Sequence, residues 1–140
     1  MTYKRRQGLA IVDTKKGILV VSGRKRVFIL PGGGADKGES RKRATIRELK
    51  EETGLIVYSC EFLFYHIGSK HRSYKGGHFR NYSKVFLIKT LGKAKPRHET
   101  KHIAYYKHGS NINISYNTKL IIEKYLEWKN RHTQKLKKFI

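Results

Sequence analysis

GGADKGESRKRATIRELKEETGL, residues 33–55 of the chain, is the stretch from which the expected fold follows. A glycine run opens it, and five residues separate Gly33 from Glu39. Ser40 is a favourable N-cap residue, and Gly54 is a favourable residue just beyond a helix C-terminus. The stretch therefore predicts a helix of about three and a half turns between them. The apolar positions that would pack this helix on a sheet are Ile46, Leu49 and Thr53.

A second face of the predicted helix is acidic. At about 100° per residue, Glu48, Glu51 and Glu52 fall within roughly 100° of one another. Neighbouring carboxylates raise each other's pKa, and a divalent cation that prefers oxygen ligands, Mg²⁺ or Mn²⁺, relieves their repulsion. Arg47 lies four residues before Glu51, where a guanidinium can orient that carboxylate. A solvated acidic helix face is the alternative interpretation.

At every defining position, residues 33–55 resemble the Nudix box, the signature of the Nudix hydrolase family. The resemblance implies an α/β fold, specifically an α/β/α sandwich with a central mixed sheet. It also implies an enzyme that hydrolyses a nucleoside diphosphate linked to another group. In such enzymes a metal-activated water attacks phosphorus, so Mg²⁺ or Mn²⁺ is the implied cofactor.

The same resemblance gives roles to individual residues. Arg47 orients the carboxylates, Glu39 supports the site as an outer ligand, and Glu48 is a metal ligand or the general base. The implied metal ligands are the carbonyl of Gly32 and the side chains of Glu48, Glu51 and Glu52.

Length and composition indicate one compact domain over residues 1–140. No apolar run approaches membrane-spanning length, and the first residues, MTYKRRQG, lack the apolar stretch of a signal peptide. Cys60 is the only cysteine, which excludes an intrachain disulfide and favours a cytoplasmic location. The formal net charge is +22, and a basic surface attracts polyanions such as phosphate-rich small molecules or RNA. The oligomeric state stays open.

The remaining segments predict strands and one further helix. Strands are expected at 8–22 (two, with a turn at 13–17), 27–30, 55–66 (a pair or one long bent strand), 82–91 and 103–106. A C-terminal helix is expected from about Asn117, followed from about 129 by a basic tail that frays. That tail either binds polyanions or is a solvated end.

Two segments outside the helix are candidates for substrate binding. Residues 31–34, PGGG, permit close backbone approach to a ligand, so Gly33 and Gly34 are candidate phosphate-binding residues. Residues 67–81 are rich in glycine, cations and aromatics, and we expect a long loop there on the active-site side. A solvated loop is an equally good interpretation of that segment. Its candidate phosphate- and base-binding residues are Lys70, Arg72, Tyr74 and Arg80.

Residues 98–102, HETKH, fit the H-E-x-x-H pattern of zinc peptidases. That motif works only on a helix, and the following residues predict a strand, so the zinc site is disfavoured. Glu99 is the more interesting residue, because several Nudix enzymes supply a late carboxylate as metal ligand or base. A surface glutamate is the alternative.

Three functions remain open from the sequence. The first is Mg²⁺-dependent pyrophosphohydrolysis of nucleoside or inositol polyphosphates, including nucleoside triphosphates and dinucleoside polyphosphates. The second is pyrophosphohydrolysis at RNA 5′ ends, for which the basic surface would hold the chain. The third is a non-catalytic Nudix-fold module that binds RNA or the ribosome.

Overall fold

The computed structural model describes residues 2–138 of the chain. Along this part of the chain, no helix is both long and apolar enough to cross a membrane. The elements are β1 (Thr2–Ile11), β2 (Asp13–Thr14), β3 (Gly17–Ser22), β4 (Gly32–Gly34), α1 (Arg41–Thr53), β5 (Ile56–Arg72), β6 (His78–Leu91), β7 (His102–Tyr106) and α2 (Tyr116–Lys137).

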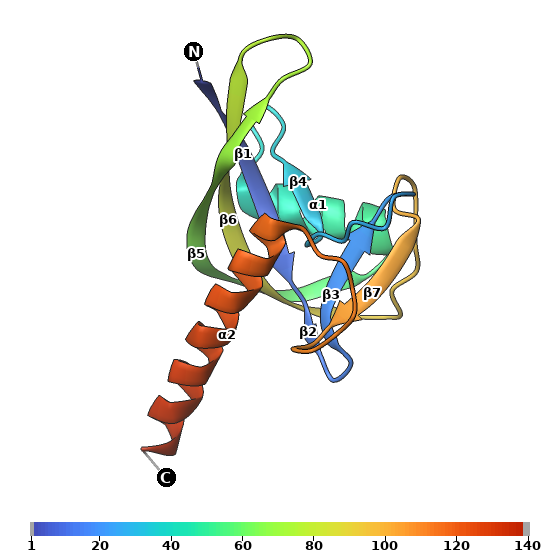
Figure 1. Cartoon of the computed structure of the whole chain (residues 1–140). Helices are drawn as coiled ribbons and strands as arrows, with labels where there is room; N and C mark the ends of the chain where they lie inside the picture. The colour runs from blue at the N-terminus through green and yellow to red at the C-terminus, as the bar shows by residue number, and fades with distance from the viewer. Residues whose placement is uncertain (1, 139–140) are drawn as a thin grey trace.

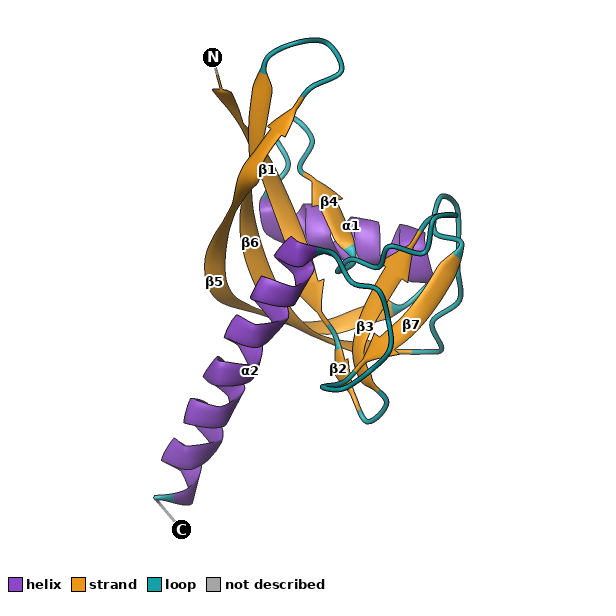
Figure 2. Ribbon diagram, viewed as in Figure 1, coloured by secondary structure: helices purple, strands orange, loops and turns teal. Residues whose placement is uncertain are grey.

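The strands form a larger and a smaller sheet (Figures 1 and 2). The larger sheet has the order β4-β1-β6-β5; β1 runs parallel to β6, and the other pairs are antiparallel. The smaller sheet has the order β2-β3-β7 and is antiparallel. The prediction of an α/β fold around a mixed sheet is confirmed.

The two helices pack on opposite faces of the larger sheet. Leu49 of α1 belongs to a buried cluster with Ala10 of β1, whereas Ile121 of α2 belongs to a second cluster with Ile11. Consecutive residues of a strand point to opposite faces, so the two helices sandwich the sheet. By the same alternation, successive side chains of β1 and β6 face α1 and α2 in turn.

The helix predicted between Ser40 and Gly54 is confirmed with its caps. The Ser40 side chain accepts a hydrogen bond from the Arg43 backbone N–H, and Gly54 adopts a left-handed conformation with φ of 76°. Leu49 and Thr53 are buried, as expected for the sheet-facing side. The acidic side is therefore turned away from the larger sheet's core.

Gly8 of β1 is the point of closest approach between α1 and the sheet. A Cβ atom at this position would overlap the Thr45 side-chain oxygen and the Arg41 carbonyl oxygen of the helix. We expect Gly8→Ala to lower the free energy of unfolding by about 3 kcal/mol, since the helix backbone must move to admit the methyl group. Urea unfolding measures this. Gly23→Ala is the control, because its Cβ would meet nothing closer than 3.9 Å; equal midpoints for the two variants would contradict the prediction.

The two strands predicted within residues 8–22 are confirmed, but the start of the first and the strand predicted at 27–30 were wrong. β1 begins at Thr2 rather than residue 8, because it pairs with β6 along its whole length. Residues 27–30 form only isolated bridges at Phe28 and Ile29. A strand lies instead at Gly32–Gly34, where none was predicted, and it pairs with Gln7–Leu9. Glycines suit this edge because a Cβ on Gly32 would overlap the Gly8 carbonyl oxygen of β1.

The long loop expected at residues 67–81 was also wrong. β5 is one long strand that continues to Arg72, β6 begins at His78, and only residues 73–77 make the turn. Gly76 and Gly77, with φ of 89° and 76°, supply the backbone conformations that this turn requires. Pairing to β1 and to each other keeps these polar strands extended.

The C-terminal helix runs further than expected, since α2 continues to Lys137. Its first turns pack on the body, and Asp13 anchors it by accepting hydrogen bonds from the Tyr125 hydroxyl at 2.6 Å and the Lys129 ammonium at 2.8 Å. Burial raises the pKa of the Tyr125 hydroxyl, and the hydrogen bond to the negatively charged Asp13 raises it further. Residues 129–138 are all exposed, and Figure 1 shows the last turns of α2 extending away from both sheets.

Candidate active site

A pocket of about 450 Å³ opens between β4, the C-terminal half of α1 and the turn before β7. The acidic side of α1 supplies Glu48 and Glu52, and the turn supplies Glu99. The rest of the lining is Arg5, Val21, Ser22, Gly23, Val27, Ile29, Gly32, Gly33 and Thr100. Three of the sequence-predicted carboxylates thus meet at one cavity.

Glu52 is the most perturbed carboxylate of this pocket. The Gly32 backbone N–H donates a hydrogen bond to its Oε1 at 3.0 Å. Burial nevertheless raises the pKa of Glu52 to about 7, and the charges of Glu48 and Glu51 add to the rise. A carboxylate with this pKa is only partly ionised at neutral pH, so a cation in the pocket would stabilise its charged form.

Arg47 joins several carboxylates around α1. Its Nε and Nη2 donate to the two oxygens of Glu39 at 2.9 and 3.0 Å, and its Nη1 donates to Glu48 at 2.9 Å. The contact with Glu51, at 3.5 Å, is longer. The hydrogen bonds from Arg47 and from the Asp36 backbone lower the pKa of Glu39 to about 2. Arg47 therefore holds Glu48 beside the pocket through a bidentate anchor on Glu39.

Gly33 and Gly34 let side chains approach the backbone of β4. A Cβ on Gly33 would lie 3.0 Å from the carboxyl carbon of Glu48, and one on Gly34 would lie 3.0 Å from the Arg5 guanidinium. Both distances are shorter than ordinary van der Waals contacts. Glycine at position 33 therefore leaves room for the Glu48 carboxylate, and glycine at position 34 leaves room for the Arg5 guanidinium. The sequence reasoning missed Arg5, because only its pairing in β1 brings the basic N-terminus to this pocket.

The oxygen donors fit a hard divalent cation better than a soft one. Glu48 and Glu52 face the pocket, where Gly32 exposes backbone, and the raised pKa of Glu52 reflects a carboxylate in need of a positive partner. Glu51 is half exposed and turned toward Arg47. Within residues 2–138, no three His, Cys, Asp or Glu side chains are already gathered as a metal cluster. The roles of these residues in metal binding stay predictions.

The structure agrees with the expectation that residues 98–102 do not form the helical zinc motif. His98 lies in a turn at φ of 54°, and His102 begins β7, so the two imidazoles do not share a helix face. Glu99, between them, lines the pocket with Glu48 and Glu52. Its catalytic role stays a prediction.

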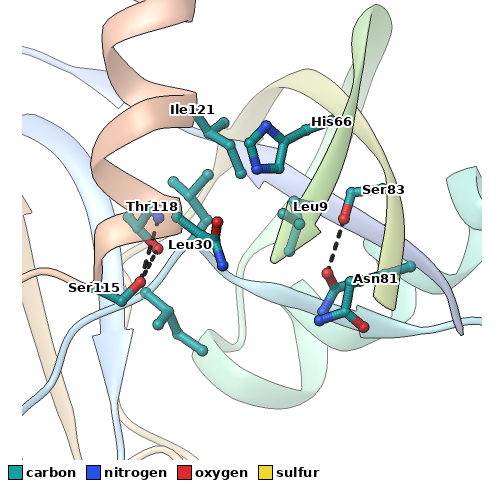
Figure 3. A pocket seen from close by; sticks show the side chains of 12 residues that line it. Leu9, Leu30, His66, Asn81, Ser83, Ser115, Thr118 and Ile121 are labelled. Carbon is teal, nitrogen blue, oxygen red and sulfur yellow. Dashed lines mark hydrogen bonds between the residues drawn. The ribbon is translucent and has the colours of Figure 1, made fainter. Parts of the chain in front are cut away.

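A second cavity, of about 170 Å³, lies on the α2 side of the larger sheet (Figure 3). His66 of β5 points into it, and its Nε2 is buried without a hydrogen-bond partner in the described part of the chain. Burial lowers the pKa of His66, which favours the neutral imidazole. The lining is Gln7, Leu9, Ile29, Leu30, His66, Gly68, Asn81, Ser83, Ser115, Asn117, Thr118 and Ile121.

The two cavities are neighbours. Ile29 lines both, and Arg5 of the first donates a hydrogen bond to Asn81 of the second at 3.1 Å. The two cavities therefore adjoin at Ile29 and at the Arg5–Asn81 hydrogen bond. No short-range sequence pattern marks the second cavity, since its lining comes from five separate segments.

The candidates from residues 67–81 lie elsewhere. Lys70 and Arg80 are cross-strand partners in the β5–β6 pair, Arg72 ends β5, and Tyr74 is almost fully exposed in the turn. None of the four lines either cavity described above. Their predicted contacts with phosphate therefore have no counterpart in the geometry of these cavities.

Comparison with known proteins gives a consistent result. Residues 2–110 match the family described as NUDIX domain. The chain is 30% identical over 125 residues to an ADP-ribose pyrophosphatase of Methanocaldococcus jannaschii, covering 86% of this chain and 72% of that protein. It is also 30% identical over 103 residues to an RNA pyrophosphohydrolase of Orientia tsutsugamushi, covering 66% of this chain and 64% of that protein.

Solved structures agree with the sequence relatives. A nudix hydrolase family member from Chromobacterium violaceum superposes with a TM-score of 0.77 and 34% identity, covering 90% of this chain and 79% of that chain. A MutT NUDIX hydrolase from Burkholderia pseudomallei superposes with a TM-score of 0.69 at 20% identity, covering 86% and 96%. The second likeness, at this identity, concerns the fold alone.

Proposed function

Because this chain belongs to the Nudix hydrolase family, we propose that it hydrolyses a phosphoanhydride bond in a nucleoside polyphosphate with the help of Mg²⁺ or Mn²⁺. The observation that carries the proposal is the pocket in which Glu52, with its pKa of about 7, lies beside Glu48 and the glycine strand β4. Membership of the family shows that the chain is a hydrolase. What we propose is the class of substrate and the identity of the metal.

Residues of α1 and β4 would hold the metal. Glu52 and Glu48 face the pocket, Glu51 follows on the same helix, and the Gly32 carbonyl is the backbone ligand in this proposal. A bound divalent cation would lower the pKa of the attacking water and neutralise charge on the leaving phosphate. Arg47 supports the site by holding Glu48 at 2.9 Å.

We assign acceptance of the proton from the attacking water to Glu99. Glu48 already accepts a hydrogen bond from Arg47, and Glu52 accepts one from Gly32. Glu99 lines the same pocket and has no ion pair within the described residues. In this proposal Glu48 and Glu52 are committed to the metal, so Glu99 is the carboxylate of the pocket that is left to take the proton.

In this proposal the second cavity receives the nucleoside of the substrate. Its apolar walls include Leu9, Leu30 and Ile121, and its polar groups include the unpartnered Nε2 of His66. Ligand cavities commonly combine apolar walls with a few polar groups that fix orientation. Arg5, between the two cavities, is placed to contact the phosphates that link nucleoside and metal site.

Pyrophosphohydrolysis at RNA 5′ ends is the second candidate. The net charge of +22 favours a long polyanion over a small nucleotide, and one relative is named RNA pyrophosphohydrolase. This candidate predicts turnover that falls steeply with salt and rises with the length of the RNA.

A substrate panel tests both candidates. Phosphate and pyrophosphate release would be measured with Mg²⁺ or Mn²⁺ on nucleoside triphosphates, diadenosine polyphosphates, ADP-ribose and 5′-triphosphorylated RNA. We expect turnover of a nucleoside polyphosphate that is lost in Glu52→Gln. Selective turnover of the RNA would instead support the second candidate. No turnover of any substrate by the folded protein would contradict both and favour a non-catalytic binding module.

A further inference from the structure

A patch of exposed aromatic rings and half-buried cations lies outside both cavities. We call it the ring–cation surface and define it by Phe62 and Tyr65 of β5, Lys84 of β6 and Arg41 of α1. The two rings meet edge to face with centroids 4.9 Å apart, yet Phe62 is 43% exposed and Tyr65 57% exposed. The Lys84 ammonium lies 5.6 and 5.7 Å from the two centroids, and the Arg41 guanidinium lies 5.7 Å from that of Tyr65.

An irregularity of β5 brings the two rings to one face. Residues three apart on a regular strand point to opposite faces. The register of β5 shifts between Phe62 and Phe64, and this bulge turns Tyr65 to the same face as Phe62. Tyr65 then lies directly opposite Lys84, and Phe62 contacts the buried Phe86 beneath it. The rings are therefore held side by side by the backbone rather than by chance rotamers.

The cations that α1 contributes near this surface do not stabilise the helix that carries them. The first turn of α1 carries Arg41, Lys42 and Arg43 and no acidic residue. The N-terminal end of a helix dipole favours anions, so cations there lower the stability of the helix. Arg41 and Lys84 are the two cations that lie over the exposed rings. An anionic partner would offset that electrostatic cost.

We propose that the ring–cation surface binds single-stranded nucleic acid, with a base stacked on Tyr65 or Phe62 and phosphates paired with Lys84 and Arg41. Exposed rings flanked by cations are the arrangement that single strands require, since each base offers a flat face and each phosphate a charge. In a duplex the base faces are already stacked. A second copy of the chain is a poor occupant, because a two-fold contact would place this surface's cations against themselves.

The proposal goes beyond the hydrolase activity, because none of the four residues lines either cavity. Binding can therefore be measured without the active site. Fluorescence anisotropy with a labelled 5′-hydroxyl RNA oligonucleotide, with the DNA of the same sequence and with the duplex of that DNA would be run in EDTA on the Glu52→Gln protein. None of these probes carries the 5′ phosphates on which the enzyme would act. Comparing RNA with DNA identifies which strand chemistry is preferred.

We expect Tyr65→Ala to raise the Kd for the preferred strand roughly 5- to 150-fold, as for the loss of one stacked base. Lys84→Gln should lower the slope of log K against log salt by about 0.7, the contribution of one phosphate contact on a single strand. Tyr58→Ala is the matched control, a tyrosine of the same strand that is 61% exposed and outside the surface. Thermal unfolding would verify that all variants are folded.

Three results would overturn the proposal. The first is unchanged affinity in both folded variants, and the second is equal affinity for the duplex and the single strand. The third is a dimer in sedimentation that Tyr65→Ala dissociates, since a second copy would then be the occupant of the surface.

Discussion

Replacing Glu52 with glutamine is expected to lower turnover more than about 100-fold and yet to raise the stability of the metal-free protein at pH 8 by about 3 kcal/mol. The loss of activity follows from the proposed metal site. Changing even an outer partner of a metal ligand costs about 10–100-fold, and removing a ligand's charge costs more. Glutamine keeps an oxygen that can accept the hydrogen bond from Gly32.

The gain in stability follows from the direction of the pKa shift. The pKa of Glu52 is raised from 4.5 to about 7 in the folded protein. Between these values the folded state binds more protons than the unfolded state, so stability falls as pH rises from about 4.5 to 7. Above pH 7 the whole penalty of the buried charge is present, and glutamine removes it.

Chemical unfolding in EDTA from pH 4 to pH 9 measures the gain in stability, and steady-state turnover measures the loss of activity. Glu127→Gln, an exposed glutamate of α2, is the control and should change neither quantity. Added Mg²⁺ should stabilise the wild type more than Glu52→Gln at pH 8, since it binds the folded state. A variant that keeps wild-type turnover would remove Glu52 from the metal site.

Replacing Arg47 with alanine is expected to lower kcat about 10- to 100-fold, the range found when a partner of a metal ligand is removed. Without the guanidinium, Glu48 loses the hydrogen bond that holds it at the pocket, and the neighbouring carboxylates lose their shared cation. Arg47→Lys should recover little activity, because an ammonium cannot reproduce the bidentate contact with Glu39 while also reaching Glu48. Lys50→Ala, an exposed cation of the same helix, is the control.

The acid stability of the Arg47 variant provides a second measurement. Arg47 lowers the pKa of Glu39 to about 2, so Glu39 contributes stability above its ordinary pKa and loses that contribution as pH falls toward 2. In Arg47→Ala the pKa of Glu39 returns toward its ordinary value. We therefore expect the melting temperature of the variant to fall less steeply than that of the wild type between pH 4.5 and pH 2. Parallel curves would show that Arg47 acts only at the pocket.

The sequence was sufficient where structure depends on near neighbours. The caps at Ser40 and Gly54 and the sequence of α1 between them specify a helix locally, and the acidic spacing places Glu48 and Glu52 together. The strands at 67–72 and 78–81 could not be predicted from their composition. Their polar residues are extended because β6 pairs with β1, a contact between segments far apart in the chain.

The residues of the candidate site also differ in whether the sequence alone could reveal them. The carboxylates of α1 come from one continuous stretch, so their spacing revealed them. Arg5 and His66 reach their cavities only through the pairing of β1, β5 and β6, and no short-range pattern marks them. Glu99 was recognisable as a candidate by family resemblance, and the structure gives it a place beside Glu48 and Glu52.

The central place of β1 in the larger sheet has a consequence for the chain during its synthesis. Thr2 pairs with His78 and Ile11 with Leu87, so β1 leaves the ribosome before its partner β6, whose paired residues are synthesised 76 positions later. Until then Leu9, Ala10 and Ile11 are without their β6 partners, and such long-range pairing is slow to form. The nascent chain is therefore most exposed to aggregation between the synthesis of β1 and that of β6, the period in which a chaperone that holds β1 would most improve the yield of folded protein.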